Sequence, residues 1–302
     1  MTKKLVVRLK GGLGNQMFQY ASAYAVAKKN NKELIIDTYT GFFRDLVFCR
    51  KYALDLFQIK ERVEKYKERL PFLLELFINR YLDKEPNLIS NRPWGFHLQE
   101  RYTRYYPEVA NLLCDKNIWF DGYWQTEKYF EDQAEDINKI FDIQPPLEEK
   151  FLRLVKEIKS QNAILIGIRL YEEAPPGGND SAPLSFYEKA AEHLAKGLEN
   201  PVFYLFCTVR EPIYQKLNLP GEIRYITHDD GYVGDLNRLW LLTNFKYQII
   251  SNSTFFWWGA WLAEKKIPNV KILACDNFHN PDSIPERWTR CNIQGQVIGN
   301  NA

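Results

Sequence analysis

A glycine-rich turn constrains this chain more than any other feature. Residues 11–16 read Gly-Gly-Leu-Gly-Asn-Gln, between an apolar run at 4–9 and an alanine-rich run at 17–27. This order predicts a buried strand, a tight turn and a buried helix. Backbone N–H groups of such a turn can approach a ligand, and a helix start favours an anion. A turn without a ligand explains the glycines equally well, but Asn15 and Gln16 favour binding because their amides can donate and accept hydrogen bonds.

Length and charge limit the classes of protein to consider. A chain of 302 residues is expected to form about two domains. The net charge is only +2, from 40 basic and 38 acidic residues, and no long basic run occurs, so nucleic acid is not an expected partner. Five scattered cysteines without a C-x-x-C pair indicate free thiols in a reducing compartment rather than a zinc site.

Hydropathy gives an expectation about location. No segment approaches the roughly 20 apolar residues that a membrane-spanning helix needs. The sequence enters its first strand directly, without the pattern of a signal peptide. We therefore expect a cytoplasmic protein without a transmembrane segment.

The coarse pattern alternates strands and helices in two sets. The first set is predicted as strands at 4–9, 33–37 and 117–122, with helices at 15–29 and within 58–85. After Pro145-Pro146 and a helix at 147–160, the second set has strands at 163–168, 202–207, 224–226, 247–250 and 270–272, with helices at 184–199, 235–243 and 254–264. We expect an α/β protein with two doubly wound domains, residues 1–150 and 151–302, facing across a cleft.

Arg169 stands one residue past the predicted strand 163–168. Open α/β sheets bind ligands at the carboxyl ends of their strands, and a guanidinium group fits phosphate oxygens with two parallel hydrogen bonds. A surface arginine that closes a strand is the alternative. Glu172 and Glu173 follow and are candidates for a base, for partners of Arg169 or for solvated loop carboxylates.

A second candidate anion site lies between the strand 247–250 and the following helix. Ser251, Asn252, Ser253 and Thr254 place hydroxyl and amide groups at a helix start, where they suit a phosphate. Ordinary helix capping is the alternative. No Asp-x-Asp sequence occurs, and the four histidines are far apart, so we expect no metal.

Three functions remain open at this point. A dinucleotide oxidoreductase would use the first glycine turn and Asp37, about 20 residues on, for the ribose, although Met17 stands where glycine or alanine is wanted. A nucleotide-sugar transferase would use both halves and hold the diphosphate with Arg169 and the helix start at Ser253. A sugar-binding module would explain the 15% aromatic residues but not two nucleotide-type domains.

Three long motifs resemble a known family. Residues 10–21, 122–130 and 250–262 are similar, in order, to the bacterial α-1,2-fucosyltransferases of glycosyltransferase family 11, and the match extends to Trp288. The resemblance implies a GT-B-like fold with two Rossmann-type domains, an acceptor-side domain at 1–150 and a GDP-sugar-binding domain at 151–302. It also implies metal-independent, inverting transfer from GDP-β-L-fucose to the 2-hydroxyl of a terminal galactose on a glycan. A lipid-linked acceptor would be compatible with peripheral association at a membrane.

One family motif is altered here. Relatives carry His-x-Arg-Arg-x-Asp at a strand end, and the matching residues are Gly167, Arg169, Leu170 and Glu172. The remaining arginine, Arg169, would neutralise charge on the departing GDP. The departures indicate a subgroup with another acceptor or another GDP-linked 6-deoxy sugar.

The resemblance also implies a set of site residues. The catalytic candidates are Arg169, Asn15 and Glu172. The donor-binding candidates are Gly12, Gly14, Asn15, Gln16, Arg169, Thr208, Ser251, Asn252, Ser253 and Thr254. The acceptor-binding candidates are Tyr123, Trp124 and Gln125. The general base is left open among Asp121, Glu172 and Glu173, and no cofactor beyond the donor substrate is expected.

Overall fold

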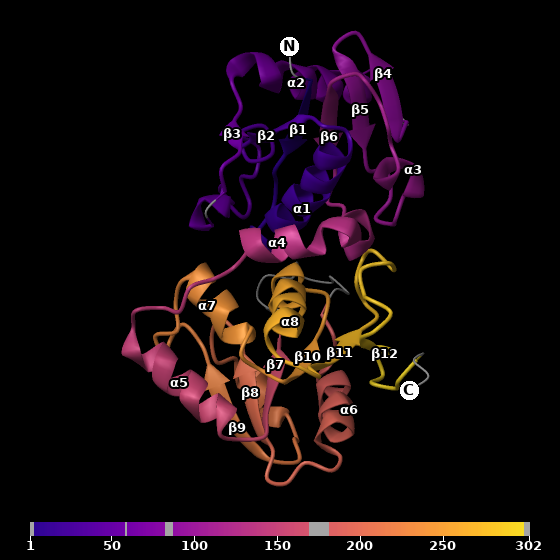
Figure 1. The fold of residues 1–302 in the computed structure, drawn as a ribbon. Coiled ribbons are helices and arrows are strands. Elements are labelled where there is room, and N and C mark those ends of the chain that lie inside the picture. Colours follow the sequence, from indigo (N-terminus) through magenta and orange to yellow (C-terminus); the bar gives the residue numbers. More distant parts are fainter. Residues whose placement is uncertain (1–2, 58, 82–86, 169–180, 299–302) are drawn as a thin grey trace. The chain divides into compact units, whose positions relative to one another are not determined.

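The computed structural model describes residues 3–57, 59–81, 87–168 and 181–298 (Figure 1). It divides into two compact units, residues 1–142 and 143–302. Each unit contains one six-stranded sheet with helices packed against it. The predicted α/β class with two parallel-sheet domains is confirmed.

The sheet of the first unit is parallel except at one edge. Its order is β3-β2-β1-β6-β5-β4, and only β4 runs antiparallel to its neighbour. The strands are β1 (Lys4–Arg8), β2 (Glu33–Asp37), β3 (Arg62–Val63), β4 (Ile89–Arg92), β5 (Gly95–Gln99) and β6 (Ile118–Asp121). The helices are α1 (Leu13–Lys29), α2 (Tyr66–Tyr81), α3 (Pro107–Ala110) and α4 (Ala134–Ile140), with short 3-10 turns at Leu54–Leu56, Glu127–Tyr129 and Glu131–Gln133.

Apolar residues at alternate strand positions build the core of the first unit. Val6, Ile35 and Trp119 come from three neighbouring strands and contact Phe72 of α2 on one face of the sheet. Parallel strands covered by helices are apolar throughout, as in Leu5, Val6 and Val7 of β1, which are fully buried. The β4–β5 hairpin was not predicted, because its sequence lacks a continuous apolar run.

The sheet of the second unit is parallel throughout. Its order is β12-β11-β10-β7-β8-β9, which in chain order is the 3-2-1-4-5-6 arrangement of dinucleotide-binding folds. The strands are β7 (Ala163–Gly167), β8 (Val202–Phe206), β9 (Glu222–Ile226), β10 (Tyr247–Ile250), β11 (Lys271–Cys275) and β12 (Thr289–Cys291). The helices are α5 (Glu149–Lys159), α6 (Leu184–Ala195), α7 (Asp235–Leu242) and α8 (Thr254–Lys266), with a 3-10 helix at Pro212–Lys216.

The strand order fixes where each unit can bind a ligand. Ligands bind open α/β sheets outside the carboxyl ends of the strands, at the point where the strand order reverses. That point lies between β1 and β6 in the first unit and between β7 and β10 in the second. Across the described ranges, no helix combines the length and the apolar character that a bilayer crossing requires.

Candidate functional site

The carboxyl edge of the second sheet carries the predicted anion site. β10 ends at Ile250, and residues 251–253 lead directly into α8. Ser253 precedes the helix with an extended backbone, its side chain does not cap α8, and the first turn of the helix holds no acidic residue. The start of α8 therefore keeps its positive dipole end uncompensated by its own sequence, as an anion site requires.

The other predicted residues of this segment differ in exposure. Ser251 is fully buried, and its hydroxyl accepts a hydrogen bond of 3.1 Å from the hydroxyl of Tyr187. Asn252 is largely buried, whereas Ser253 and Thr254 are half-buried. The buried Ser251 side chain thus holds the turn against α6 through Tyr187. The hydroxyl groups of Ser253 and Thr254 are more accessible to a ligand.

Gly167 occupies the position where the family motif has histidine. A side chain there would begin 2.7 Å from the ring of Phe256 in α8, so the close approach of α8 to β7 requires glycine. Phe256 in turn packs edge-on against Phe206 at the end of β8, with ring centroids 5.7 Å apart. The Phe256 ring therefore occupies the space at the end of β7 that a histidine side chain at position 167 would need.

Four residues named in the sequence analysis fall in one segment that follows β7. Arg169, Leu170 and Glu172, together with Glu173, lie in 169–180, outside the described residues. The structure does describe Ile168, directly before them, as a buried residue whose N–H bonds to the carbonyl of Phe206. Ile168 therefore follows β7 at the carboxyl edge of the sheet, between β8 and β10.

Sequence reasoning missed a buried arginine at this edge. Arg238 of α7 is only 6% exposed, and its Nη1 and Nη2 atoms donate to the carbonyl groups of Tyr232 and Cys207, at 3.0 and 3.1 Å. Its guanidinium lies 4.3 Å from the centre of the Phe206 ring. Burial lowers the pKa of Arg238 to about 10 although the Asp235 carboxylate favours the charged form, and within the described ranges no carboxylate lies close enough to form an ion pair with it. The sequence did not predict that Arg238 is buried, because an arginine among the apolar residues of a helix is normally expected on its exposed side.

Thr208 follows β8 next to this arginine. Its carbonyl accepts the N–H of His228 at 2.8 Å, which joins the ends of β8 and β9. Its side chain is half-buried and bonds to none of the described residues. Thr208 and Ser253 thus offer two hydroxyl groups from two strand ends of one sheet edge.

The glycine turn of the first unit is held by glutamines. Gly11 has a φ of +76°, a conformation that favours glycine. The Gln16 amide is fully buried, donating to the carbonyl groups of Gly11 and Lys51 at 2.9 and 2.8 Å and accepting from the N–H of Ala53 at 2.9 Å. Gln19, which sequence reasoning did not single out, bonds both backbone groups of Lys10. The Gln16 side chain therefore fixes the turn and a neighbouring loop, with its hydrogen bonds directed into the protein.

The structure brings together one donor candidate and one acceptor candidate of the first unit. Gln125 donates to Oδ1 of Asn15 at 2.9 Å. Gly12 precedes α1 as its N-cap, Gly14 lies in the buried first turn, and the space above Gly12 is open. The turn and the residues after β6 thus form one polar edge.

A charge cluster lies at the reversal point between β1 and β6. Asp121 bonds Arg8 at 2.8 Å and Lys10 at 2.9 Å. Burial alone would raise the pKa of Asp121, but the Lys10 and Arg8 cations outweigh it and hold that pKa well below its usual range. A carboxylate held so firmly in its charged form is a poor proton acceptor.

Glu100 follows β5, and its pKa is shifted in the opposite direction to that of Asp121. Its Oε2 accepts the N–H groups of Tyr123 and Trp124 at 2.5 and 3.2 Å, whereas its Oε1 is buried without a hydrogen-bond partner among the described residues. Burial raises the pKa of Glu100 although the two amide donors lower it. Nothing in the local sequence signalled this residue, because its role depends on the neighbouring strand β6.

The aromatic pair after β6 divides into an exposed and a buried member. Tyr123 is half-buried, and the Lys10 ammonium lies 4.9 Å from the centre of its ring. Trp124 is fully buried, with a φ of +52°, and packs against Phe120 and Tyr129. Tyr123 therefore presents a ring edge that a sugar can contact, whereas the Trp124 side chain belongs to the core.

Asp37, the ribose-binding candidate of the oxidoreductase hypothesis, is occupied within the chain. It is fully buried, and its Oδ1 accepts the N–H groups of Tyr39 and Thr40, each at 2.9 Å. Burial raises the pKa of Asp37. The carboxylate caps the turn after β2, which removes the main residue argument for a dinucleotide.

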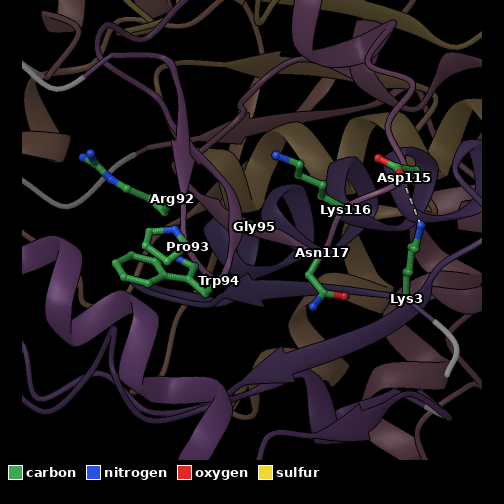
Figure 2. A pocket seen from close by; sticks show the side chains of 8 residues that line it. All are labelled: Lys3, Arg92, Pro93, Trp94, Gly95, Asp115, Lys116 and Asn117. Carbon is green, nitrogen blue, oxygen red and sulfur yellow. Dashed lines mark hydrogen bonds and ion pairs between the residues drawn. The ribbon is translucent and has the colours of Figure 1, made fainter.

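A pocket of about 310 Å³ lies at the opposite edge of the first sheet. Figure 2 shows that Lys3 and Asp115 on its wall are paired. Arg92, also on the wall, forms an ion pair with Glu75 of α2. Trp94 and Asn117 complete much of its lining. The amino-terminal ends of strands form this pocket, away from the edge where α/β sheets bind nucleotides.

Acidic, histidine and cysteine side chains are the usual protein ligands of metal ions. Within the part of the chain that the structure describes, no three of these side chains gather as metal ligands would. The charged groups at both sheet edges are instead paired with each other or with backbone groups.

Comparisons with known proteins cover nearly the whole chain. A family model described as Glycosyl transferase family 11 matches residues 1–289. An Escherichia coli alpha-1,2-colitosyltransferase is 29% identical over 95% of this chain and 98% of its own length. The Escherichia coli O-antigen biosynthesis glycosyltransferase WbnK is 27% identical over 84% of this chain and 88% of its own.

Solved structures show the same fold at low sequence identity. Arabidopsis thaliana FUT1 in complex with GDP gives a TM-score of 0.51 at 12% identity, covering 91% of this chain and 70% of its own. A NodZ alpha-1,6-fucosyltransferase soaked with GDP-fucose gives a TM-score of 0.50 at 15% identity, covering 87% and 93%. The fold is thus the GT-B-like fold of sugar-nucleotide-dependent enzymes.

Proposed function

Since the chain belongs to glycosyl transferase family 11, we propose that it transfers L-fucose from GDP-β-L-fucose to the 2-hydroxyl of a terminal galactose on a glycan. The observation that carries this proposal is the family match, which spans both units. The alpha-1,2 linkage in the name of one relative and the GDP-fucose soaked into one similar structure support it. The oxidoreductase alternative loses support because Asp37 is used within the chain.

Donor binding is assigned to the carboxyl edge of the second sheet. The uncapped start of α8 and the buried Arg238 suit a diphosphate, and the Thr208 and Ser253 hydroxyl groups can add hydrogen bonds. A buried cation that forms no ion pair is costly, and an anionic ligand beside it would offset that cost. Arg169 is assigned to the leaving diphosphate, where charge develops as the bond from the sugar to phosphate breaks.

Acceptor binding is assigned to the carboxyl edge of the first sheet. Tyr123 offers a ring for a sugar face, and Asn15 and Gln125 offer amides for hydroxyl groups. In the transfer, the galactose oxygen forms the bond to the anomeric carbon on the face opposite GDP, GDP leaves with the bonding electron pair, and the hydroxyl proton needs an acceptor.

Glu100 is the described carboxyl group best suited to accept that proton. Asp121 is unsuited, because Arg8 and Lys10 keep it charged and already fill its hydrogen bonds. Glu100 keeps one oxygen without a partner, and burial raises its pKa toward the range in which a carboxylate is an effective base. An acceptor hydroxyl would supply the donor that Oε1 lacks.

A second donor has a specific observation in its favour. The relative with 29% identity is named a colitosyltransferase, and colitose is fucose without its 3-hydroxyl group. The exchange of the motif histidine for Gly167, with Phe256 packed beside it, makes this region more apolar. A less polar donor pocket would suit a sugar with one hydroxyl group fewer.

The test is a donor panel with and without galactosides. Purified protein is incubated with GDP-fucose, GDP-colitose, GDP-mannose and UDP-galactose, and release of the nucleotide is measured. We expect GDP release that depends on a galactoside and persists in excess EDTA. Loss of activity with EDTA that manganese restores would contradict the metal-independent mechanism, and a thermal shift larger with NAD than with GDP would contradict the GDP-sugar donor.

A further inference from the structure

Helix α2 packs against the sheet of the first unit (Figure 1). One side of this helix carries exposed apolar side chains. Tyr66 is 72% exposed, Phe77 55% and Tyr81 64%. Leu70 and Leu74 are exposed as well. The five side chains on this side, called here the outer face of α2, are Tyr66, Leu70, Leu74, Phe77 and Tyr81.

The acidic residues of the helix point the other way. Glu68 and Glu75 are buried, and they pair with Arg62 at 2.7 Å and with Arg92 at 2.6 Å. Lys4 also pairs with Glu68, at 3.0 Å. The inner side of α2 thus buries its two neutralised acids beside Phe72, and apolar side chains lie on the outer side, where an amphipathic surface helix carries polar ones.

Helical geometry arranges the outer face as one band with basic margins. At about 100° per residue, the five apolar positions fall within an arc of about 80°. Lys67 and Arg80, both exposed, fall just outside the two sides of that arc. Arg80 also lies against the ring of Tyr81, at 5.7 Å from its centre. The exposed surface of α2 is therefore apolar and cationic, without an exposed acid of its own.

A loop after β2 repeats this pattern. Leu46 and Val47 are more than four-fifths exposed, and Phe43 and Phe48 are exposed beside them. The one acid of the loop, Asp45, accepts the N–H groups of residues 48 and 50 and so folds the loop on itself.

Two aromatic contacts connect the loop to α2. Tyr39 stacks on Phe43 with ring centroids 5.7 Å apart, and the Arg69 guanidinium of α2 lies 4.6 Å from the centre of the Tyr39 ring. The loop and α2 therefore form adjoining parts of the surface of the first unit.

We propose that the outer face of α2 and the loop 43–48 bind the surface of an anionic lipid bilayer. A helix with an apolar face and flanking lysine or arginine lies in the interface plane of such a bilayer, with the apolar side chains below the headgroups. Tyrosines at both ends of the band suit the boundary between water and lipid, and the cations suit anionic headgroups. A contiguous exposed apolar surface in a protein of this size marks an interaction site. The inference does not depend on the identity of the donor sugar.

The test is sedimentation of the full chain with vesicles. One set of vesicles contains equal parts of phosphatidylglycerol and phosphatidylcholine, and the other contains phosphatidylcholine alone. We expect the protein to bind the first set and to bind the second at least tenfold more weakly. The double substitution Lys67→Glu and Arg80→Glu should weaken binding to the anionic vesicles by about 30-fold or more, since each cation near such a surface contributes a factor of about five and the two factors multiply.

Apolar variants and a matched control separate this role from misfolding. Leu70→Glu with Phe77→Glu should weaken vesicle binding at least tenfold. Leu113→Glu, at another exposed leucine of the same unit, should bind as the wild type does. All variants should keep the GDP-induced thermal shift of the wild type. Equal sedimentation of wild type and α2 variants, or α2 variants that change only self-association in ultracentrifugation, would overturn the proposal.

Discussion

At the carboxyl edge of the first sheet, Asp121 pairs with Arg8 and Lys10, and glutamine side chains bond the turn around them. At the carboxyl edge of the second sheet, Arg238 reaches only backbone carbonyl groups, and the start of α8 has no acidic residue. The two units share a sheet architecture, yet the first edge pairs its charges with one another, whereas among the described residues Arg238 at the second edge forms no ion pair and only the Asp235 carboxylate, beyond ion-pair distance, opposes its charge. The difference supports our proposal that the anionic diphosphate binds to the second unit and the neutral sugar acceptor to the first.

The largest expected effect is at the carboxyl edge of the first sheet, where Asp121 pairs with Arg8 and Lys10. Asp121→Asn should lower the free energy of unfolding by about 3–5 kcal/mol, because it leaves two largely buried cations without their anion. Its GDP affinity should change little, which a denaturant melt and a binding titration measure together. Asp115→Asn, at the exposed Lys3 pair, is the control and should leave stability nearly unchanged. A loss of GDP affinity in a folded Asp121→Asn protein would break the comparison.

The same carboxylate gives a pH dependence. The pKa of Asp121 is lower in the folded chain than in the unfolded one, so its stabilising contribution is complete above the unfolded value of about 3.9. That contribution is lost as the pH falls through the lower folded pKa. The wild type should therefore lose more stability on acidification than Asp121→Asn, and identical pH profiles would contradict this.

The next effect concerns the diphosphate. Arg169→Ala should lower kcat by about 10²–10³, or roughly 3–4 kcal/mol, because a charged donor to the leaving group acts mainly in the transition state. Arg169→Lys should also be impaired, since it keeps the charge but not the two parallel hydrogen bonds. Arg210→Ala, at an exposed arginine paired with Asp230, is the control. A folded Arg169→Ala protein with nearly normal kcat would remove this residue from the mechanism.

Glu100→Gln should separate activity from stability. We expect kcat to fall about 10²-fold if Glu100 accepts the acceptor proton. Because burial raises the pKa of Glu100, ionisation of this group costs stability as the pH rises through its folded pKa. The glutamine variant should thus gain stability relative to the wild type as the pH rises above the unfolded value of about 4.3. Unchanged kcat with this stability gain would leave Glu100 only as a support of the turn at Tyr123.

The smallest expected effect is at Arg238, at the carboxyl edge of the second sheet. Arg238→Gln should weaken GDP binding about tenfold, since the buried cation then no longer compensates the diphosphate. Thermal melting is measured alongside. A lower melting temperature with unchanged GDP affinity would mean that Arg238 only joins α7 to the strand ends through its carbonyl contacts.

The sequence predicts those structural features that depend on neighbouring residues in the chain, and it misses those that depend on contacts between distant residues. Continuous apolar runs such as residues 163–167 and 202–206 predicted strands correctly, because buried parallel strands are apolar on both faces. The β4–β5 hairpin and the strand β12 were missed, since they are short and partly polar. The helix start at Ser253 was found because strand, polar turn and helix follow each other in the sequence.

Site features that depend on distant contacts were not predicted. Glu100 acquires its character from the amides that follow β6, and Arg238 from carbonyl groups of residues 207 and 232. Gln16 matched a motif, but its amide bonds the loop at Lys51 and Ala53, which no local pattern indicates. Trp124 likewise matched a motif and is fully buried. A motif locates a segment, whereas the direction of each side chain follows from the fold.

Amide hydrogen exchange with and without GDP tests the assignment of the donor to the second unit most directly. The account predicts slower exchange on GDP binding in residues 252–258, at the start of α8, and in residues 206–208 after β8. It predicts unchanged exchange in residues 121–125, which we propose for the acceptor. Protection confined to residues 121–125 would contradict the account.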